Sequence, residues 1–194
     1  MTFDDGPEPN VTPQVSQALA DAGLRATFFA LGYKVAQYPE LTRAICKAGH
    51  DMGIHTWDHP DLATLDSAGI RDQLQRTSDA IVAAGCPTPR LMRFPFGSYS
   101  DTALAVAAEL DLQPIQWSDD SNDWRYAVDI GDGSAASAEV EKDLDNIIKA
   151  IDPQSRGAIV LQHDTYYSSI GTLQKQIDLA QDRGLDIVPV SQCV

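Results

Sequence analysis

The sequence predicts an α/β fold of about seven parallel strands with helices packed outside them. Two observations lead to this fold class. Short apolar runs typical of buried strands alternate along the 194 residues with stretches whose apolar residues recur at helical spacing. Polar and charged residues gather where the apolar runs end, and parallel α/β folds carry their functional side chains there. The alternation alone fits either a barrel, complete or incomplete, or a wound open sheet.

The strands are identified as short apolar runs bounded by turn residues. The first is short, because Asp4-Asp5-Gly6-Pro7 predicts a turn directly after Met1–Phe3. The expected strands, in chain order, are residues 1–3, 25–31, 51–55, 91–94, 113–118, 158–162 and 186–190.

The helices are identified by apolar residues at helical spacing and by their start and stop signals. The longest runs from Asp66 to Ala84 and stops at Gly85, and its expected apolar face carries Ile70, Leu74, Ile81 and Val82. The expected helices are residues 41–49, 66–84, 101–110 (capped by Ser100 or Asp101), 138–150 and 172–184. Residues 119–136, rich in Asp, Gly and Ser, are expected to form a loop.

The charge balance excludes several classes of partner. With 14 basic and 28 acidic residues the net charge is −14, which argues against nucleic acid, anionic membranes and polyphosphates. No run approaches the 18 apolar residues of a membrane span. We expect one catalytic domain, residues 1–194, acting as a monomer and trimmed at its N-terminal strand. A secretion signal would then lie upstream, so its absence here does not decide the compartment.

The three cysteines, Cys46, Cys86 and Cys193, are too far apart for a zinc knuckle or a CxxC redox pair. They fit either buried small apolar side chains or one disulfide of a secreted protein. In the second case the third thiol would pair with a cysteine upstream of Met1, and Cys193 is its best candidate.

Polar clusters follow five of the expected strands, and we expect them to converge on one face of the sheet. They are Asp4 and Asp5 after the first strand, His55 and His59 after the third, Arg93 at the end of the fourth, Asp119, Asp120 and Asp123 after the fifth, and His163 and Asp164 at the end of the sixth.

Two of these clusters predict a metal site. A helical turn after the third strand would point His55 and His59 the same way, and Asp5 would add an oxygen ligand. Two imidazoles and one carboxylate with open positions suit catalytic zinc or a similar divalent ion. The competing interpretation is that the Asp-Asp-Gly-Pro segment is an ordinary surface turn. The histidine pair at this spacing is only a moderately specific signal for a metal site.

The remaining clusters supply acid–base chemistry. Asp4, adjacent to Asp5, can serve as a general base, and His163 can protonate a leaving group from the opposite side. Asp123 can hold that imidazole in its charged form, and Arg93 can fix a carboxylate. A lone histidine at the end of a strand is more often structural, and we interpret His50 in that way.

Five motifs in order give the chain a resemblance to a known family. They are Thr2-Phe3-Asp4-Asp5-Gly6, His55-Thr56-Trp57-Asp58-His59, Arg93-Phe94-Pro95-Phe96-Gly97, Asp120-Ser121-Asn122-Asp123-Trp124 and Leu161-Gln162-His163-Asp164. The chain resembles the NodB-homology polysaccharide deacetylases, carbohydrate esterase family 4. The resemblance implies a distorted, incomplete (β/α) barrel of about seven parallel strands.

The resemblance also implies roles for individual residues. Asp5, His55 and His59 would hold the metal, zinc or alternatively cobalt. Asp4 would be the general base on the bound water, oriented by Arg93, and His163 the general acid, tuned by Asp123. Trp124 and Leu161 would form the acetyl pocket, and the backbone N–H in the third motif would stabilise the oxyanion. Phe96 stands where the family usually has Tyr, which leaves that N–H in place.

The substrate follows from a narrower likeness. Residues 55–62 and the ending Val190-Ser191-Gln192-Cys193 are similar to fungal chitin deacetylases, whose terminal cysteine commonly pairs with one ahead of the first strand. We expect a secreted or cell wall-associated chitin or chitooligosaccharide N-deacetylase. Peptidoglycan and acetylated xylan are the alternative substrates, and a non-catalytic carbohydrate-binding protein is the alternative function. Nine acidic against two basic residues in 119–145 favour neutral chitin over anionic peptidoglycan.

Overall fold

A sheet of seven parallel strands curls into an incomplete barrel, which confirms the expected fold class. The computed structural model describes residues 1–126, 134–152, 154 and 157–193. The strand order is β5-β4-β3-β2-β1-β7-β6, so the first strand lies inside the sheet and β5 and β6 form its edges. The strands are β1 (Thr2–Asp4), β2 (Thr27–Ala30), β3 (Asp51–Ile54), β4 (Leu91–Met92), β5 (Gln113–Pro114), β6 (Asp119–Asp120) and β7 (Val160–His163).

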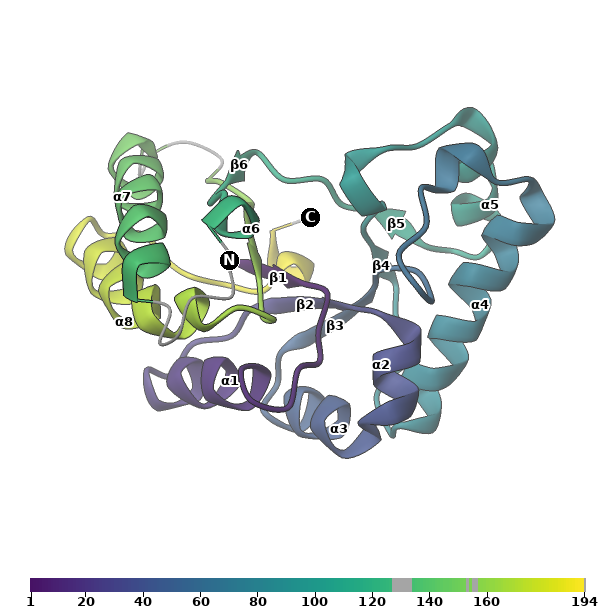
Figure 1. Cartoon of the computed structure of the whole chain (residues 1–194), viewed down its shortest axis with the longest axis horizontal. Helices are drawn as coiled ribbons and strands as arrows, with labels where there is room; N and C mark the ends of the chain where they lie inside the picture. The colour runs from purple at the N-terminus through teal and green to yellow at the C-terminus, as the bar shows by residue number, and fades with distance from the viewer. Residues whose placement is uncertain (127–133, 153, 155–156, 194) are drawn as a thin grey trace.

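Helices surround the curled sheet (Figure 1). In that view α7 and α8 lie on one side of the strands, α4 and α5 on the other, and α1 to α3 below. The helices are α1 (Thr12–Asp21), α2 (Gly32–Gln37), α3 (Pro39–Lys47), α4 (Ser67–Ala83), α5 (Asp101–Glu109), α6 (Asp123–Tyr126), α7 (Ser134–Ala150) and α8 (Tyr167–Asp182). The chain also contains three short 3-10 helices, at Leu62–Thr64, Pro95–Gly97 and Val190–Gln192, within the described residues.

The strongest helix signals are confirmed. The Asp66 side chain caps α4 by accepting a hydrogen bond from the Gly69 N–H at 2.8 Å. Ser100, one of the two expected caps, does the same for α5 through the Ala103 N–H. Three of the four residues expected on the apolar face of α4, Ile70, Leu74 and Ile81, are fully buried in the core. The prediction is wrong for Val82, which is 45% exposed because it lies outside the buried stripe of the helix.

The seventh strand is not the one expected from the sequence. Residues 186–190 were predicted to be a strand, but that segment joins no ladder, and Pro189 has no N–H to donate to one. The Val190 N–H bonds instead to the Thr27 hydroxyl at 2.8 Å. The seventh strand is β6, which lies in the predicted loop 119–136 and pairs with Val160 and Leu161.

Other boundaries differ for local reasons. The strand expected at 113–118 ends at Pro114, because it is an edge strand and the chain leaves β4 after the Ile115 N–H bonds to the Met92 carbonyl. The predicted loop 119–136 also contains α6 and the start of α7; residues 127–133 of that prediction lie outside the described residues. Helix α8 begins at Tyr167 rather than at 172. Its first turn contains Ser168 and Ser169, which are weak helix formers but are buried by tertiary packing. Helices α1 and α2 were not predicted.

Two residue interpretations are resolved by the packing. His50 is structural, as expected: its Nδ1 accepts the Ala26 N–H at 3.2 Å and its Nε2 lies 3.1 Å from the Ser16 hydroxyl. Cys46 and Cys86 form a disulfide, and Cys193 is free and exposed. Of the two interpretations left open, the one with a disulfide is confirmed for Cys46 and Cys86, while secretion and an upstream partner for Cys193 stay predictions.

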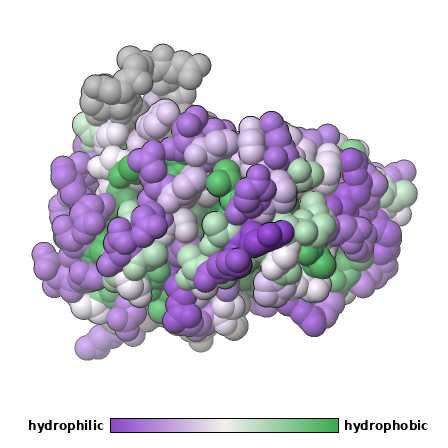
Figure 2. Space-filling model, turned by 90° about the horizontal axis from the view of Figure 1, so that it is seen from below, coloured by the Kyte–Doolittle hydropathy of each residue, from purple (hydrophilic) through white to green (hydrophobic). Residues whose placement is uncertain are grey.

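The molecular surface reflects the polar composition. Hydrophilic residues cover much of the face seen in Figure 2, with hydrophobic residues scattered between them. None of the helices in the described ranges is long and apolar enough to cross a membrane.

Candidate active site

The predicted polar clusters converge at the carboxyl ends of the strands. Asp4 is the last residue of β1 and lies in register with His163, the last residue of β7. His55 follows β3 directly, and Arg93 follows β4. A pocket of about 430 Å³ opens here, lined by Asp4, Asp5, His55, His59, Phe94, Phe96, Trp117, Asp120, Trp124, Leu161, His163 and Tyr166.

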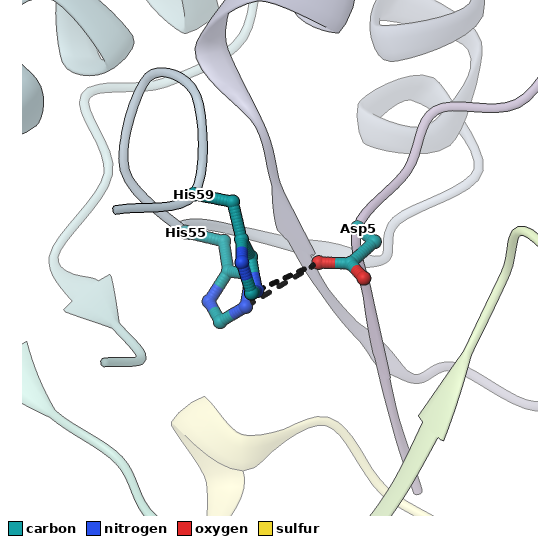
Figure 3. Close-up of side chains that lie close together, drawn as sticks. All are labelled: Asp5, His55 and His59. Carbon is teal, nitrogen blue, oxygen red and sulfur yellow. Dashed lines mark ion pairs between the residues drawn. The ribbon is translucent and has the colours of Figure 1, made fainter. Parts of the chain in front are cut away.

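Asp5, His55 and His59 point toward one another (Figure 3). Asp5 Oδ1 lies 3.5 Å from the Nε2 of His55 and 3.5 Å from the Nε2 of His59. The Nδ1 of His55 donates to the Arg93 carbonyl at 2.9 Å, which leaves Nε2 as the ring atom with a lone pair facing Asp5. Burial lowers the pKa of His55 to about 3, so this imidazole is neutral at physiological pH, as a metal ligand must be.

The three residues fit a divalent ion. Metal–ligand bonds of about 2.0–2.2 Å at tetrahedral angles separate ligand atoms by about 3.3–3.6 Å, which matches the two 3.5 Å contacts. Within the described residues, Asp5 Oδ1 is a buried oxygen with no hydrogen-bond donor. A buried carboxylate oxygen without a donor is costly, and a cation in contact with it removes that cost.

The two histidines meet by a different route from the one predicted. No helix lies between β3 and His59: the chain continues as a loop in which Thr56 and His59 adopt left-handed conformations, with φ of 69° and 66°. The Thr56 hydroxyl accepts the His59 N–H at 3.0 Å and closes the loop. The prediction that both imidazoles face one point is confirmed, and the helical turn is wrong.

Asp4 forms a buried ion pair with Arg93. Arg93 Nη1 donates to Asp4 Oδ1 at 2.9 Å, and Arg93 is fully buried. The same guanidinium donates to the Thr2 hydroxyl and the Ile115 carbonyl, so its orientation is fixed. Burial raises the pKa of Asp4 above its usual value, while Arg93 and His163 oppose that rise by favouring the carboxylate.

His163 pairs with Asp123 on the other side of the pocket. Asp123 Oδ1 lies 2.7 Å from His163 Nδ1, and Asp123 Oδ2 accepts the His163 backbone N–H at 2.7 Å. Burial opposes protonation, but Asp123, together with the charges of Asp4 and Asp5, raises the pKa of His163 to about 9. The imidazole is therefore protonated at neutral pH.

Aromatic and aliphatic side chains line the remaining walls. Phe96, Trp124 and Leu161 line the pocket, as expected, and the Phe96 ring packs edge-on against His59 at 4.6 Å. The Trp124 indole N–H donates to Asp120 Oδ2 at 3.2 Å. Trp117 and Tyr166 also line the pocket and were not predicted, although each lies within three residues of a predicted polar cluster.

Two predicted acidic residues lie elsewhere. Asp119 accepts a hydrogen bond from the Ser118 hydroxyl and is not part of the pocket lining. Asp164 is buried beneath the Asp4–Gly6 turn, where Thr12 donates to its Oδ2 at 2.5 Å. A Cβ on Gly6 would come within 2.1 Å of Asp164 Oδ2, so a side chain at Gly6 would collide with this support.

A family model described as polysaccharide deacetylase matches residues 1–115. The chitooligosaccharide deacetylase of Bradyrhizobium is 36% identical over 208 residues, which cover 99% of this chain and 88% of that protein. The chain belongs to the polysaccharide deacetylase family. This is carbohydrate esterase family 4, in agreement with the resemblance of the five motifs.

Other relatives of this chain differ from it in length and from one another in the substrate that their names give. A peptidoglycan-N-acetylglucosamine deacetylase of Listeria monocytogenes is 33% identical over 192 residues, covering 99% of this chain but 38% of that protein. The structure of a family 4 carbohydrate esterase from Streptomyces lividans in complex with acetate has 31% identity and a TM-score of 0.83. The match covers 95% of this chain and 88% of the Streptomyces chain.

Proposed function

We propose that the protein is a metal-dependent N-deacetylase that hydrolyses the acetamide of N-acetylglucosamine units in chitin or chitooligosaccharides. The observation that carries this proposal is the arrangement of one pocket. Arg93 holds the Asp4 carboxylate, and Asp123 holds the protonated His163. Both pairs lie beside three residues that fit a divalent ion: Asp5, His55 and His59.

The ligands would be Asp5, His55 and His59, and zinc or cobalt suits their nitrogen and oxygen donors. When bound, the ion would polarise the acetyl carbonyl and lower the pKa of the attacking water. Asp4 then takes a proton from that water as general base. Its Oδ1 is held by Arg93, which leaves Oδ2, 3.7 Å from His55 Nε2, facing the ligands.

His163 supplies the proton that the leaving amine needs. Its Nε2 lies 4.0 Å from Asp5 Oδ2, so it faces the ligands from the β7 side, while Asp123 holds its Nδ1. Water adds to the acetyl carbon, the carbon–nitrogen bond breaks, and the nitrogen takes a proton from His163. The products are acetate and a free amino sugar, so the step consumes one water and needs no further reactant.

The acetyl methyl group would sit between Leu161 and Trp124, and the exposed Phe96 ring would flank the sugar. The named substrates of the relatives, a chitooligosaccharide and a peptidoglycan, share the N-acetylglucosamine unit. The net charge of −14 favours neutral chitin among them, because an anionic polymer would be repelled.

The Cys46–Cys86 disulfide supports a secreted or cell wall-associated protein, since structural disulfides persist in oxidising compartments. A polysaccharide substrate outside the cell agrees with that location. We propose that the protein acts there as a monomer.

The test is acetate release from chitin oligomers, peptidoglycan and acetylxylan measured in parallel. We expect release from chitin oligomers in the presence of zinc, and none after chelation. Faster release from peptidoglycan or acetylxylan would reassign the substrate. Binding of chitin oligomers without acetate release from any polymer would instead support a non-catalytic carbohydrate-binding protein.

Two variants test the assigned roles. Asp4→Asn should abolish acetate release while metal stays bound, because the side chain remains but no longer accepts a proton. His59→Ala should lose the metal in an elemental analysis of the dialysed protein. Retained turnover in the first variant, or full occupancy in the second, would refute the corresponding assignment.

A further inference from the structure

The loop between the two histidine ligands, residues 56–58, is held by two helices that carry no ligand. One edge of the loop contacts α2: the Gly32 N–H donates to the Thr56 carbonyl at 3.0 Å, and the Tyr33 N–H donates to the Trp57 carbonyl at 3.1 Å. These bonds use the free N–H groups at the start of a helix. They leave the loop's own N–H groups to be satisfied elsewhere.

A single side chain of α4 accepts hydrogen bonds from two of those N–H groups. Gln73 Oε1 accepts the Trp57 N–H at 2.7 Å and the Asp58 N–H at 3.3 Å. Gln73 Nε2 donates to Asp58 Oδ1 at 2.7 Å, so both ends of the amide contact the loop. One turn along α4, the Arg76 guanidinium stacks over the Trp57 ring at 4.1 Å.

The loop conformation needs this support. Thr56 and His59 have positive φ, which side chains other than glycine rarely adopt, so the surroundings must hold the loop in place. His59 is also the more exposed of the two histidines, with 27% of its side chain accessible against 3% for His55. The position of its imidazole therefore depends on the loop as well as on the Phe96 ring that packs against it.

We infer that Gln73 is a positioning residue for the metal centre: it holds the 56–58 loop so that His59 Nε2 faces Asp5. This inference rests on the proposed function in that it takes Asp5, His55 and His59 as metal ligands. Groups that orient metal ligands without touching the ion change metal affinity about 10–100-fold when removed. Gln73 would act in this way through backbone N–H groups.

The test compares zinc affinity among variants of the metal-free protein, measured by competition with a chromophoric chelator. Gln73→Met keeps the length of the side chain and removes its hydrogen bonds, and we expect zinc binding about 10–100-fold weaker. Gln73→Glu keeps an acceptor for the two N–H groups but replaces the donor to Asp58 Oδ1 with a second carboxylate, so zinc binding should weaken in this variant too. The matched control is Gln75→Ala, since exposed Gln75 bonds only to Asp79 among the contacts described on α4.

The outcomes separate this inference from the proposed function. If the unsubstituted protein fails to bind zinc, the proposed metal site is refuted. If it binds and folded Gln73→Met binds equally well, or if Gln75→Ala weakens binding as much, the positioning role is refuted.

Thermal unfolding in chelator identifies a purely structural role. Such a role would lower the melting temperature of Gln73→Met without changing the zinc affinity of its folded form. Should Gln73→Met not fold, Gln73→Ser, whose hydroxyl is too short to reach either N–H, takes its place under the same criteria.

Discussion

Replacing Asp123 by Asn removes the negative charge that faces the His163 imidazole and keeps the shape of the side chain. Asp123 is fully buried, its Oδ1 lies 2.7 Å from His163 Nδ1, and 12% of the His163 side chain is accessible. The pKa of His163 rises from 6.5 to about 9 in the folded protein. At about 1.4 kcal/mol per unit this corresponds to about 3 kcal/mol of preference for the charged imidazole.

The Asn variant should lower the pKa of His163 by about 1–3 units, because burial then opposes protonation without its main partner. The assay is an NMR titration of the histidine ring in metal-free protein, with partly exposed Asp145→Asn as the control. Asp145 pairs with Lys149 on α7, so its removal should leave His163 unchanged. A pKa near 9 in Asp123→Asn would refute the electrostatic account of this pair.

The sign of the pH dependence follows from the same shift. Because the folded pKa lies above the unfolded value, the pair stabilises the protein fully below about pH 6.5, and that contribution is lost as pH rises to about 9. Unfolding free energies of metal-free protein, measured by urea denaturation between pH 6 and 10, should fall across this window. The fall should be absent or shifted to lower pH in Asp123→Asn.

Three further substitutions test the structure. Arg93→Met should lower the free energy of unfolding in urea by about 3–5 kcal/mol, because it leaves the buried Asp4 carboxylate unpaired, whereas exposed Arg90→Met should change it little. Joint replacement of Cys46 and Cys86 by Ala opens a 40-residue loop and should remove about 4 kcal/mol, with Cys193→Ser as the thiol control. Gly6→Ala should lower the melting temperature and the zinc affinity together, since its Cβ would meet the Asp164 carboxylate at 2.1 Å. A stability close to that of the unsubstituted protein in any of the three would contradict the contact on which it is based.

Local patterns were sufficient for the elements with strong signals of their own. Helix α4 was predicted almost to the residue because a 17-residue amphipathic run lies between an Asp cap and a Gly stop. Helices α1 and α2 were missed. Helix α1 has no side-chain cap, and Val15 and Leu19 are its only large apolar residues in the core, whereas α2 has six residues, too few to establish a helical period.

Strand pairing was harder to predict, since it depends on distant segments. Residues 186–190 resemble a strand locally, yet the N–H groups of Val190 and Ser191 donate to the side chains of Thr27 and Asp51 instead of to a neighbouring strand. Asp119–Asp120 has no strand pattern of its own and becomes β6 because its neighbour β7 offers a free edge. Such an outcome is decided by which backbone groups meet in space.

The sequence by itself determined the parallel α/β class, the five polar clusters and most residues of the pocket, though not Trp117 and Tyr166. Strand ends in such folds share one face, and that rule needs no coordinates. Only the tertiary structure decided how those residues meet: the left-handed loop that brings His59 to Asp5, the Cys46–Cys86 bond, and the support from Gln73. These contacts join segments far apart in the chain. Their geometry depends on how α2, α4 and the strands pack, which no local pattern encodes.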